Sequence, residues 1–99
     1  MSRNKNRFGS DFSSYEIKQV WNKANQVPGY NPNQYRKDIC GNWIQFSAYG
    51  DINSQYGWEI DHIKPLSKNG SDDLNNLQPL FWKTNRDKAD IYPWNCQMI

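Results

Sequence analysis

Hydrophobic residues near the N-terminus recur at the spacing of an amphipathic helix. Four of them follow one another at intervals of three, one and three residues, so a helix places them on one face. This stripe consists of Ile17, Val20, Trp21 and Ala24. Ser13 precedes the stripe and Glu16 follows Ser13 by three residues, which is the capping-box pattern of a helix start. Pro28 and Gly29 predict where the helix ends.

Short strand-like segments account for the next hydrophobic residues. Residues 43–46 read as a strand because aliphatic and aromatic side chains alternate with a polar one. Ile60 and Ile63 mark a second strand, and Pro65 ends its pairing because proline has no N–H to donate. Before these strands, Arg36 and Lys37 read either as contacts to a nucleic-acid backbone or as plain surface, and the second reading is the commoner one.

The second strand is followed by a polar loop, a return segment and a helix. Residues 68–73 form the loop, whose Asn-Gly step suits a positive φ. The return segment has hydrophobic landmarks, and Pro79 predicts that it is irregular. Its landmarks are Leu74, Leu77 and Leu80. From about Phe81 the composition becomes polar with few β-branched residues, which predicts a helix, so the unit is a hairpin followed by a helix.

This hairpin and helix carry residues suited to acid–base and metal chemistry. His62 is the single histidine of the chain, and a neutral imidazole is well matched to removing a proton near neutral pH. Asp61 and Asn85 supply oxygen donors of the kind that Mg²⁺ accepts. Neighbouring strand residues point to opposite faces, so Asp61 and His62 share a site only where the strand ends or bends.

The same stretch resembles the HNH endonucleases, whose ββα-metal fold is a hairpin followed by a helix around one divalent cation. The resemblance rests on Glu-x-Asp-His-Ile-x-Pro from Glu59, Asn-Leu-Gln-x-Leu from Asn76 and Asn-x-x-Lys from Asn85 to Lys88. The offsets of 14 residues from His62 to Asn76 and of nine from Asn76 to Asn85 are those of the family. The motif covers about a third of the chain, and its specificity lies in the agreement of several spaced features.

The resemblance implies a role for each motif residue. His62 is the expected general base, Asp61 and Asn85 are the expected ligands of one divalent cation, Mg²⁺ or Mn²⁺, and Asn76 braces the hairpin as part of the catalytic site. The third motif letter is asparagine here and histidine in the name of the family, a variant that removes one imidazole ligand. The implied activity is metal-dependent hydrolysis of DNA phosphodiester bonds, and RNA remains open as a substrate.

Arg86 and Lys88 on the predicted helix are candidate phosphate contacts. Two other functions stay open beside the nuclease. One is a nucleic-acid-binding module that does not cleave, and the other is an accessory subunit of a phage packaging or restriction machine. Binding alone needs basic and aromatic groups and gives no reason for a base beside metal ligands, so the nuclease reading is favoured.

Each motif residue also has a plain structural reading. A lone histidine is commonly a surface or satisfied core residue, and an Asp-His pair can form a local hydrogen bond. Asn76 can cap a turn, while Asn85 and Lys88 can lie on a solvated helix face. The joint spacing of these residues favours the catalytic reading.

Composition sets the size and class of the fold. The 99 residues suffice for one small α+β domain, residues 13–99, in which an N-terminal helix and short strands pack on the ββα-metal hairpin–helix unit. Aromatic residues reach 15%, so a few large rings can supply much of the core. Residues 91–94 are expected to complete that core. Residues 1–12 read as a flexible basic arm that either touches phosphates or only aids solubility.

Charge and hydropathy add two expectations. The net charge of +2 permits nucleic-acid binding without proving it. No long apolar run occurs, so we expect neither a transmembrane segment nor a secretory leader, no membrane partner, and a cytoplasmic protein. The sequence does not indicate an oligomeric state.

Two cysteines, Cys40 and Cys96, are too few for a disulfide framework, and we expect free thiols, with a bond between them left open. Many HNH proteins hold a structural zinc with two Cys-x-x-Cys pairs beside the motif. Here Trp43 and Thr84 occupy two of the corresponding places, so no structural zinc is expected. Phe81 and neighbouring aromatic rings are expected to pack where that metal would hold the chain.

Overall fold

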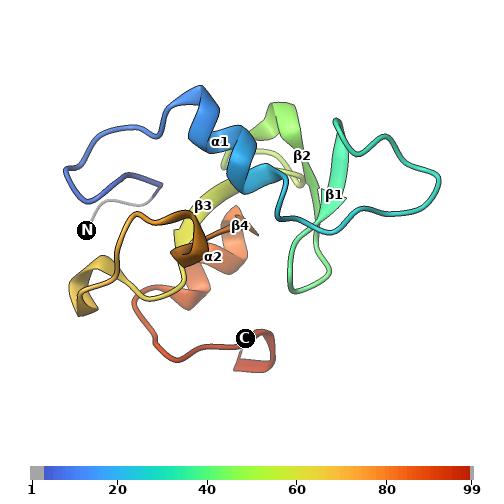
Figure 1. The fold of residues 1–99 in the computed structure, drawn as a ribbon. Coiled ribbons are helices and arrows are strands. Elements are labelled where there is room, and N and C mark those ends of the chain that lie inside the picture. The colour runs from blue at the N-terminus through green and yellow to red at the C-terminus, as the bar shows by residue number, and fades with distance from the viewer. Residues whose placement is uncertain (1–3, 99) are drawn as a thin grey trace.

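The computed structural model describes residues 4–98, which fold into two strand pairs and two α-helices joined by short 3₁₀ turns (Figure 1). In chain order the helices and strands are α1 (Ser14–Trp21), β1 (Tyr35–Lys37), β2 (Trp43–Gln45), β3 (Trp58–His62), β4 (Leu77–Phe81) and α2 (Trp82–Lys88). The 3₁₀ turns span Phe46–Ala48, Leu66–Lys68, Leu74–Asn76 and Cys96–Met98. None of the helices in this part of the chain is both long and apolar enough to cross a membrane.

Both strand pairs are antiparallel, and this mixture of helices and strands agrees with the predicted α+β class. In the first sheet β1 pairs with β2, with Arg36 opposite Ile44. In the second sheet β3 pairs with β4, from Trp58 opposite Phe81 to His62 opposite Leu77. Helix α2 begins directly after β4, so the hairpin and the helix are continuous in the chain.

Helix α1 starts as the sequence predicts and ends earlier. Ser13 accepts a hydrogen bond from the backbone of Glu16, and Glu16 accepts one from the backbone of Ser13, which completes the capping box. The helix ends at Trp21, seven residues before Pro28. Asn25 causes this early end, because its backbone exchanges two hydrogen bonds with Lys37 of β1 and must be extended there.

The core consists of a few large rings and aliphatic side chains between α1 and the two sheets. The rings of Trp21 and Trp58 lie 5.3 Å apart, and Phe46 meets Trp21 edge-on at 5.4 Å. Ile60 of β3 and Leu77 of β4 belong to the same buried cluster. Each large ring removes roughly 150–250 Å² from water, which lets so short a chain form a core.

Pro79 was predicted to make the return segment irregular, and this prediction is wrong. Pro79 lies within β4 directly opposite Ile60. The N–H of Ile60 points away from β4 and donates to Asn4 instead, so this is a non-hydrogen-bonded pair of the antiparallel ladder. The nitrogen of Pro79 also faces away from β3, where the missing N–H costs no ladder bond.

The sequence also misplaced residues on both sides of the hairpin. Arg36 was read as a DNA contact or as plain surface, but it is buried in β1 and donates to the carbonyl oxygens of Pro32, Asn22 and Ala24. Residues 91–94 were expected to complete the core, yet Ile91 is 42% exposed. None of residues 91–94 belongs to the buried core cluster or packs against it in the described part of the chain.

The C-terminal segment is attached by a disulfide between Cys40 and Cys96, which corrects the expectation of free thiols. The bond joins the loop after β1 to the last 3₁₀ turn. The sequence alone did not reveal this pairing, because 56 residues separate the two cysteines.

A buried carboxylate joins the β1–β2 loop to the residue before α2. Many HNH proteins are expected to hold a structural zinc in this region. Asp38 is 1% exposed and accepts hydrogen bonds from the backbone N–H groups of Cys40, Asn42 and Phe81, at 2.9–3.0 Å. The amide of Asn42 in turn donates to Thr84. Aromatic packing was expected to hold this region, and Phe81 does pack on the core, but the direct link is polar.

We predict that Asp38→Ala destabilises the fold by roughly 2–4 kcal/mol, because three backbone N–H donors lose a buried carboxylate acceptor. Asp87→Ala is the matched control, since Asp87 is an exposed carboxylate on α2, and it should change stability by less than about 0.5 kcal/mol. Urea unfolding of both variants measures the difference. Equal unfolding midpoints for the two variants would show that Asp38 is not the link described here.

Candidate active site

The three residues that carry the predicted chemistry line one cavity of about 510 Å³. Asp61 and His62 reach it from β3, and Asn85 reaches it from α2. His62 is the last residue of β3, so the strand ends where the two neighbouring side chains must share a site. This is the condition that the alternation of strand side chains imposes.

Asp61 is buried and accepts hydrogen bonds from two side chains. Its exposed fraction is 6%, and its two carboxylate oxygens accept from Lys88 Nζ at 3.1 Å and from Gln78 Nε2 at 2.9 Å. Burial raises the pKa of Asp61 above its ordinary value, while the hydrogen bond from Gln78 and the charge of Lys88 oppose that rise. A further cation beside Asp61 would favour its ionised form.

Asn85 is oriented by a second buried carboxylate. Its Nδ2 donates to Glu59 Oε1 at 3.0 Å, which turns the amide oxygen of Asn85 away from Glu59. Glu59, Asp61 and Lys88 are all at least 94% buried, and the ammonium group of Lys88 pairs with Asp61. With both carboxyl groups ionised, the local charge is negative and favours a bound cation. The alternative that Asn85 and Lys88 form a solvated helix face is wrong.

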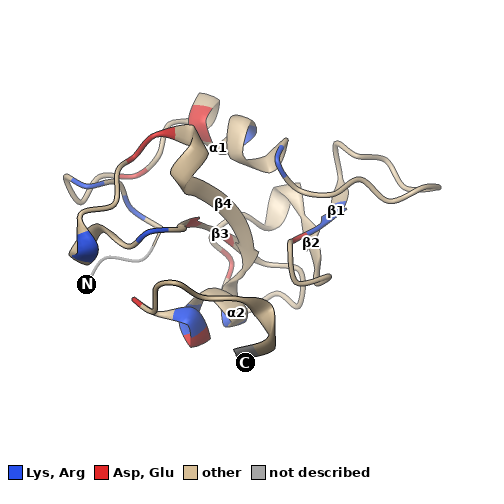
Figure 2. Cartoon of the chain, turned by 60° about the horizontal axis from the view of Figure 1, so that its bottom comes forward, with Lys and Arg blue, Asp and Glu red and all other residues tan. Residues whose placement is uncertain are grey.

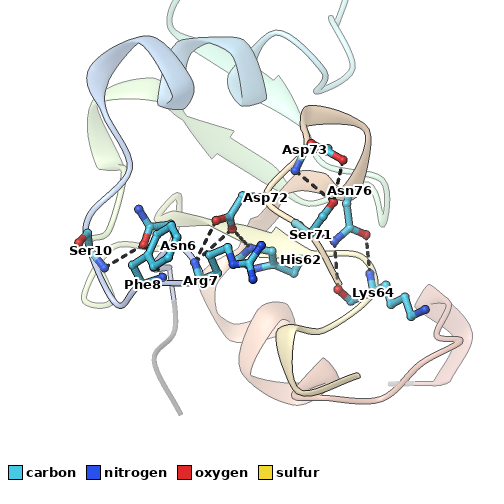
Figure 3. Close-up of polar contacts among 10 residues, drawn as sticks. All are labelled: Asn6, Arg7, Phe8, Ser10, His62, Lys64, Ser71, Asp72, Asp73 and Asn76. Carbon is cyan, nitrogen blue, oxygen red and sulfur yellow. Dashed lines mark hydrogen bonds and ion pairs between the residues drawn. The ribbon is translucent and has the colours of Figure 1, made fainter. Parts of the chain in front are cut away.

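His62 is held by an acidic residue that the sequence analysis did not select. Its Nε2 lies 2.8 Å from Asp72 Oδ1 (Figure 3). The centre of its ring lies 6.0 Å from that of Phe12. His62 therefore pairs with a carboxylate ten residues along the chain, and not with its neighbour Asp61 as the alternative reading had it. Asp72 and Asp73 are adjacent in a polar loop, and no sequence signal showed which of them turns inward.

Asn76 spans the loop between β3 and β4. Its Oδ1 accepts from the backbone N–H of Lys64 at 2.8 Å, and its Nδ2 donates to the carbonyl oxygens of Lys64 and Ser71 at 3.0 and 2.8 Å (Figure 3). The side chain thus closes the loop from which Asp72 reaches His62.

The two basic residues of α2 lie in different surroundings. Lys88 is 1% exposed and donates to Asp61 and to the carbonyl oxygen of His62. The guanidinium group of Arg86 lies 5.4 Å from the centre of the Trp82 ring, and its Nε is buried without a partner in the part of the chain that is described. Figure 2 shows acidic residues on β3 at the centre of the molecule, and basic residues on the N-terminal segment and on α2.

The N-terminal segment also lines the cavity, which the sequence did not indicate. Asn4 and Arg7 are among the lining residues. Asn4 Oδ1 accepts from the backbone N–H of Ile60 and from the hydroxyl of Tyr49, both at 2.8 Å. Burial raises the pKa of Tyr49 to about 12. Residues 4–12 therefore contact the domain, and the division into an arm and a domain at residue 13 stays a prediction.

The possible metal ligands at the cavity are oxygen atoms, which hard cations prefer. Within residues 4–98, no three His, Cys, Asp or Glu side chains are grouped so as to hold a metal ion. Asp61 supplies a carboxylate and Asn85 an amide oxygen at the cavity, which Asn4, Asn6 and Asp90 also line. Mg²⁺ commonly retains several waters and takes one or two carboxylates together with substrate phosphates, so this donor set suits that ion.

Comparison with known proteins gives one match. No curated protein and no solved structure matches the chain. A model of the HNH endonuclease family matches residues 38–90, which span β2, β3, β4 and α2 and amount to more than half of the chain. That range holds the cavity residues contributed by β3 and α2. The chain therefore belongs to the HNH endonuclease family.

Proposed function

We propose that this protein is a divalent-metal-dependent endonuclease that hydrolyses DNA phosphodiester bonds. The observation that carries the proposal is the meeting of Asp61, His62 and Asn85 at one cavity. In this proposal β3, β4 and α2 are the ββα-metal unit. Family membership supports nuclease activity in general, and these three residues support the mechanism.

The residues at the cavity fit a divalent cation. Asp61 and Asn85 would hold it, since each carboxylate oxygen has a second lone pair beside the one used by Lys88 or Gln78. The bond from Asn85 to Glu59 leaves the amide oxygen of Asn85 available. When bound, the ion would supply positive charge that offsets charge developing on the phosphate and on the leaving 3′ oxygen.

His62 acts as the general base in this mechanism. Its neutral imidazole takes a proton from a water molecule whose oxygen attacks the phosphorus, and the bond from phosphorus to the 3′ oxygen breaks. Asn76 holds the loop beside His62 through its three hydrogen bonds to backbone groups. Lys88 holds both Asp61 and the carbonyl oxygen of His62, so it fixes the two neighbours relative to α2.

Arg86 and Lys88 remain candidate phosphate contacts, but a phosphate would reach the two residues in different ways. Arg86 is partly exposed, so a phosphate can approach its guanidinium group without a rearrangement of the fold. Lys88 is buried and meets a phosphate only if its ammonium group leaves Asp61.

His62→Ala should keep the fold and lower the rate of plasmid nicking by about 10²–10⁴, the usual effect of losing a general base. The wild-type protein should nick with Mg²⁺ or Mn²⁺ and stop in EDTA, while its circular dichroism spectrum is unchanged by EDTA. Gel assays of supercoiled plasmid measure both effects. Full activity of His62→Ala, or robust nicking in EDTA, would disprove this mechanism.

Variants of Asn85 test whether its amide oxygen holds the cation. Asn85→Ala removes a donor and should raise the metal concentration needed for half-maximal rate. Asn85→Asp keeps an oxygen donor, so its metal requirement should not rise, although its added negative charge opposes the phosphate. Asn85→His should shift the preference towards Mn²⁺, Co²⁺ or Ni²⁺, which accept imidazole. Superimposable curves of rate against metal concentration for all four proteins would exclude Asn85 as a ligand.

Asn76 and Asn75 form a matched pair for testing the loop brace. Asn76→Ala removes three hydrogen bonds and should cost roughly 1.5–3 kcal/mol of stability as well as activity. Asn75 is the exposed neighbour, and Asn75→Ala should leave both close to wild type. Urea unfolding and nicking rates measure the two effects, and equal behaviour of the pair would count against the brace.

A further inference from the structure

We propose that Asp72 is a positioning residue for His62, and that the turn at residues 6–9 holds Asp72 in place. The HNH motif assigns no role to either feature. This inference rests on the proposed function in one respect, because it takes His62 as the general base.

The bond to Asp72 selects which nitrogen of His62 can accept a proton. A carboxylate is only an acceptor, so the nitrogen facing it, Nε2, carries the hydrogen. In a neutral imidazole the other nitrogen, Nδ1, then has a free lone pair. The Phe12 ring beside the imidazole and the Lys88 bond to the His62 carbonyl oxygen further restrict the orientation of the residue. Asp72 therefore fixes both the tautomer and the direction of the base.

Asp72 is in turn oriented by the backbone of the N-terminal segment. The N–H of Arg7 donates to both of its carboxylate oxygens, at 3.2 and 3.1 Å (Figure 3). These bonds connect residues 65 positions apart in the chain. On the other side, Asn76 binds the carbonyl oxygen of Ser71, the residue before Asp72. Arg7 thus holds the carboxylate of Asp72, while Asn76 holds the backbone beside it.

The turn that presents the Arg7 N–H is closed by its own hydrogen bonds. The N–H of Gly9 donates to the carbonyl oxygen of Asn6 at 2.9 Å, and the side-chain oxygen of Asn6 accepts from Phe8 and Ser10 (Figure 3). Gly9 has a φ of +77°, a conformation that glycine adopts without strain. The N-terminal segment therefore supplies a preformed donor for Asp72, and through it a part of the catalytic site.

A double-mutant cycle separates positioning from general damage. Asp72→Ala should lower kcat by about 10- to 100-fold with a much smaller change in KM, an effect of the size found when the hydrogen-bond partner of a metal-ligating histidine is lost. Asp73→Ala is the control, because Asp73 is an exposed neighbour of equal charge that contacts Ser71. Asp72→Ala should have no further effect in a His62→Ala background, since a residue that acts through His62 has nothing left to position.

The single histidine allows a test that does not need activity. In nuclear magnetic resonance spectra of the wild-type protein, the hydrogen of His62 should be on Nε2 and exchange slowly with water. Asp72→Ala should abolish that protection and Asp73→Ala should preserve it. Asp72→Asn keeps the shape of the side chain and an amide oxygen acceptor, so its protection of the His62 hydrogen should lie between those of Asp72→Ala and Asp73→Ala. It replaces Asp72→Ala in the test if that variant does not fold.

The Arg7 N–H is tested by a pair of substitutions that remove the same side chain. Arg7→Pro deletes the N–H, and proline suits this second position of a turn. Arg7→Ala keeps the N–H. Arg7→Pro should reduce both kcat and the protection of the His62 hydrogen, whereas Arg7→Ala should leave that protection unchanged.

The outcomes distinguish the two proposals. Cleavage by the wild type with equal kcat for Asp72→Ala and Asp73→Ala overturns the positioning role and leaves the nuclease proposal standing. An equal loss from Asp72→Ala with and without His62 also overturns it. No cleavage by the wild type overturns the nuclease proposal, and the magnetic resonance result alone then decides whether Asp72 holds His62.

Discussion

The buried ion pair between Asp61 and Lys88 is the interaction on which the arrangement of the site depends. It joins the last turn of α2 to the end of β3, and both side chains are buried. Breaking one partner of such a pair leaves an unpaired buried charge, which is far more costly than losing an exposed salt bridge. Because Lys88 also binds the His62 carbonyl oxygen, the orientation of α2 and the path of β3 are set together.

A chain of polar links extends this arrangement outward from the small core. Asp38 fixes the residue directly before α2, Glu59 fixes Asn85, and Asp72 fixes His62. In each case a carboxylate accepts from a group on a different segment of the chain. The aromatic core accounts for compactness, whereas these directed bonds account for the placement of individual side chains, since hydrophobic packing is not directional.

The sequence predicted correctly those features that depend on residues close to one another in the chain. The capping box of α1 and the strand end at His62 both follow from local rules, and the family spacing selected the Asp61, His62 and Asn85 that line one cavity. The errors concern long-range contacts. Arg36 became buried because carbonyl oxygens of another segment surround its guanidinium group, and Asp72 faces His62 because its loop folds back over β3. No periodicity or motif encodes such meetings.

The disulfide between Cys40 and Cys96 gives the molecule a covalent topology with its own consequence. The segment that it closes into a ring includes Asp61, His62, Asn76 and Asn85. A backbone cut anywhere inside that ring leaves the two fragments joined as one molecule while the bond is oxidised. Residues 4–12 lie outside the ring, so the segment that holds Asp72 is joined to the ring by a single covalent path, and one backbone cut between that segment and Cys40 separates the two.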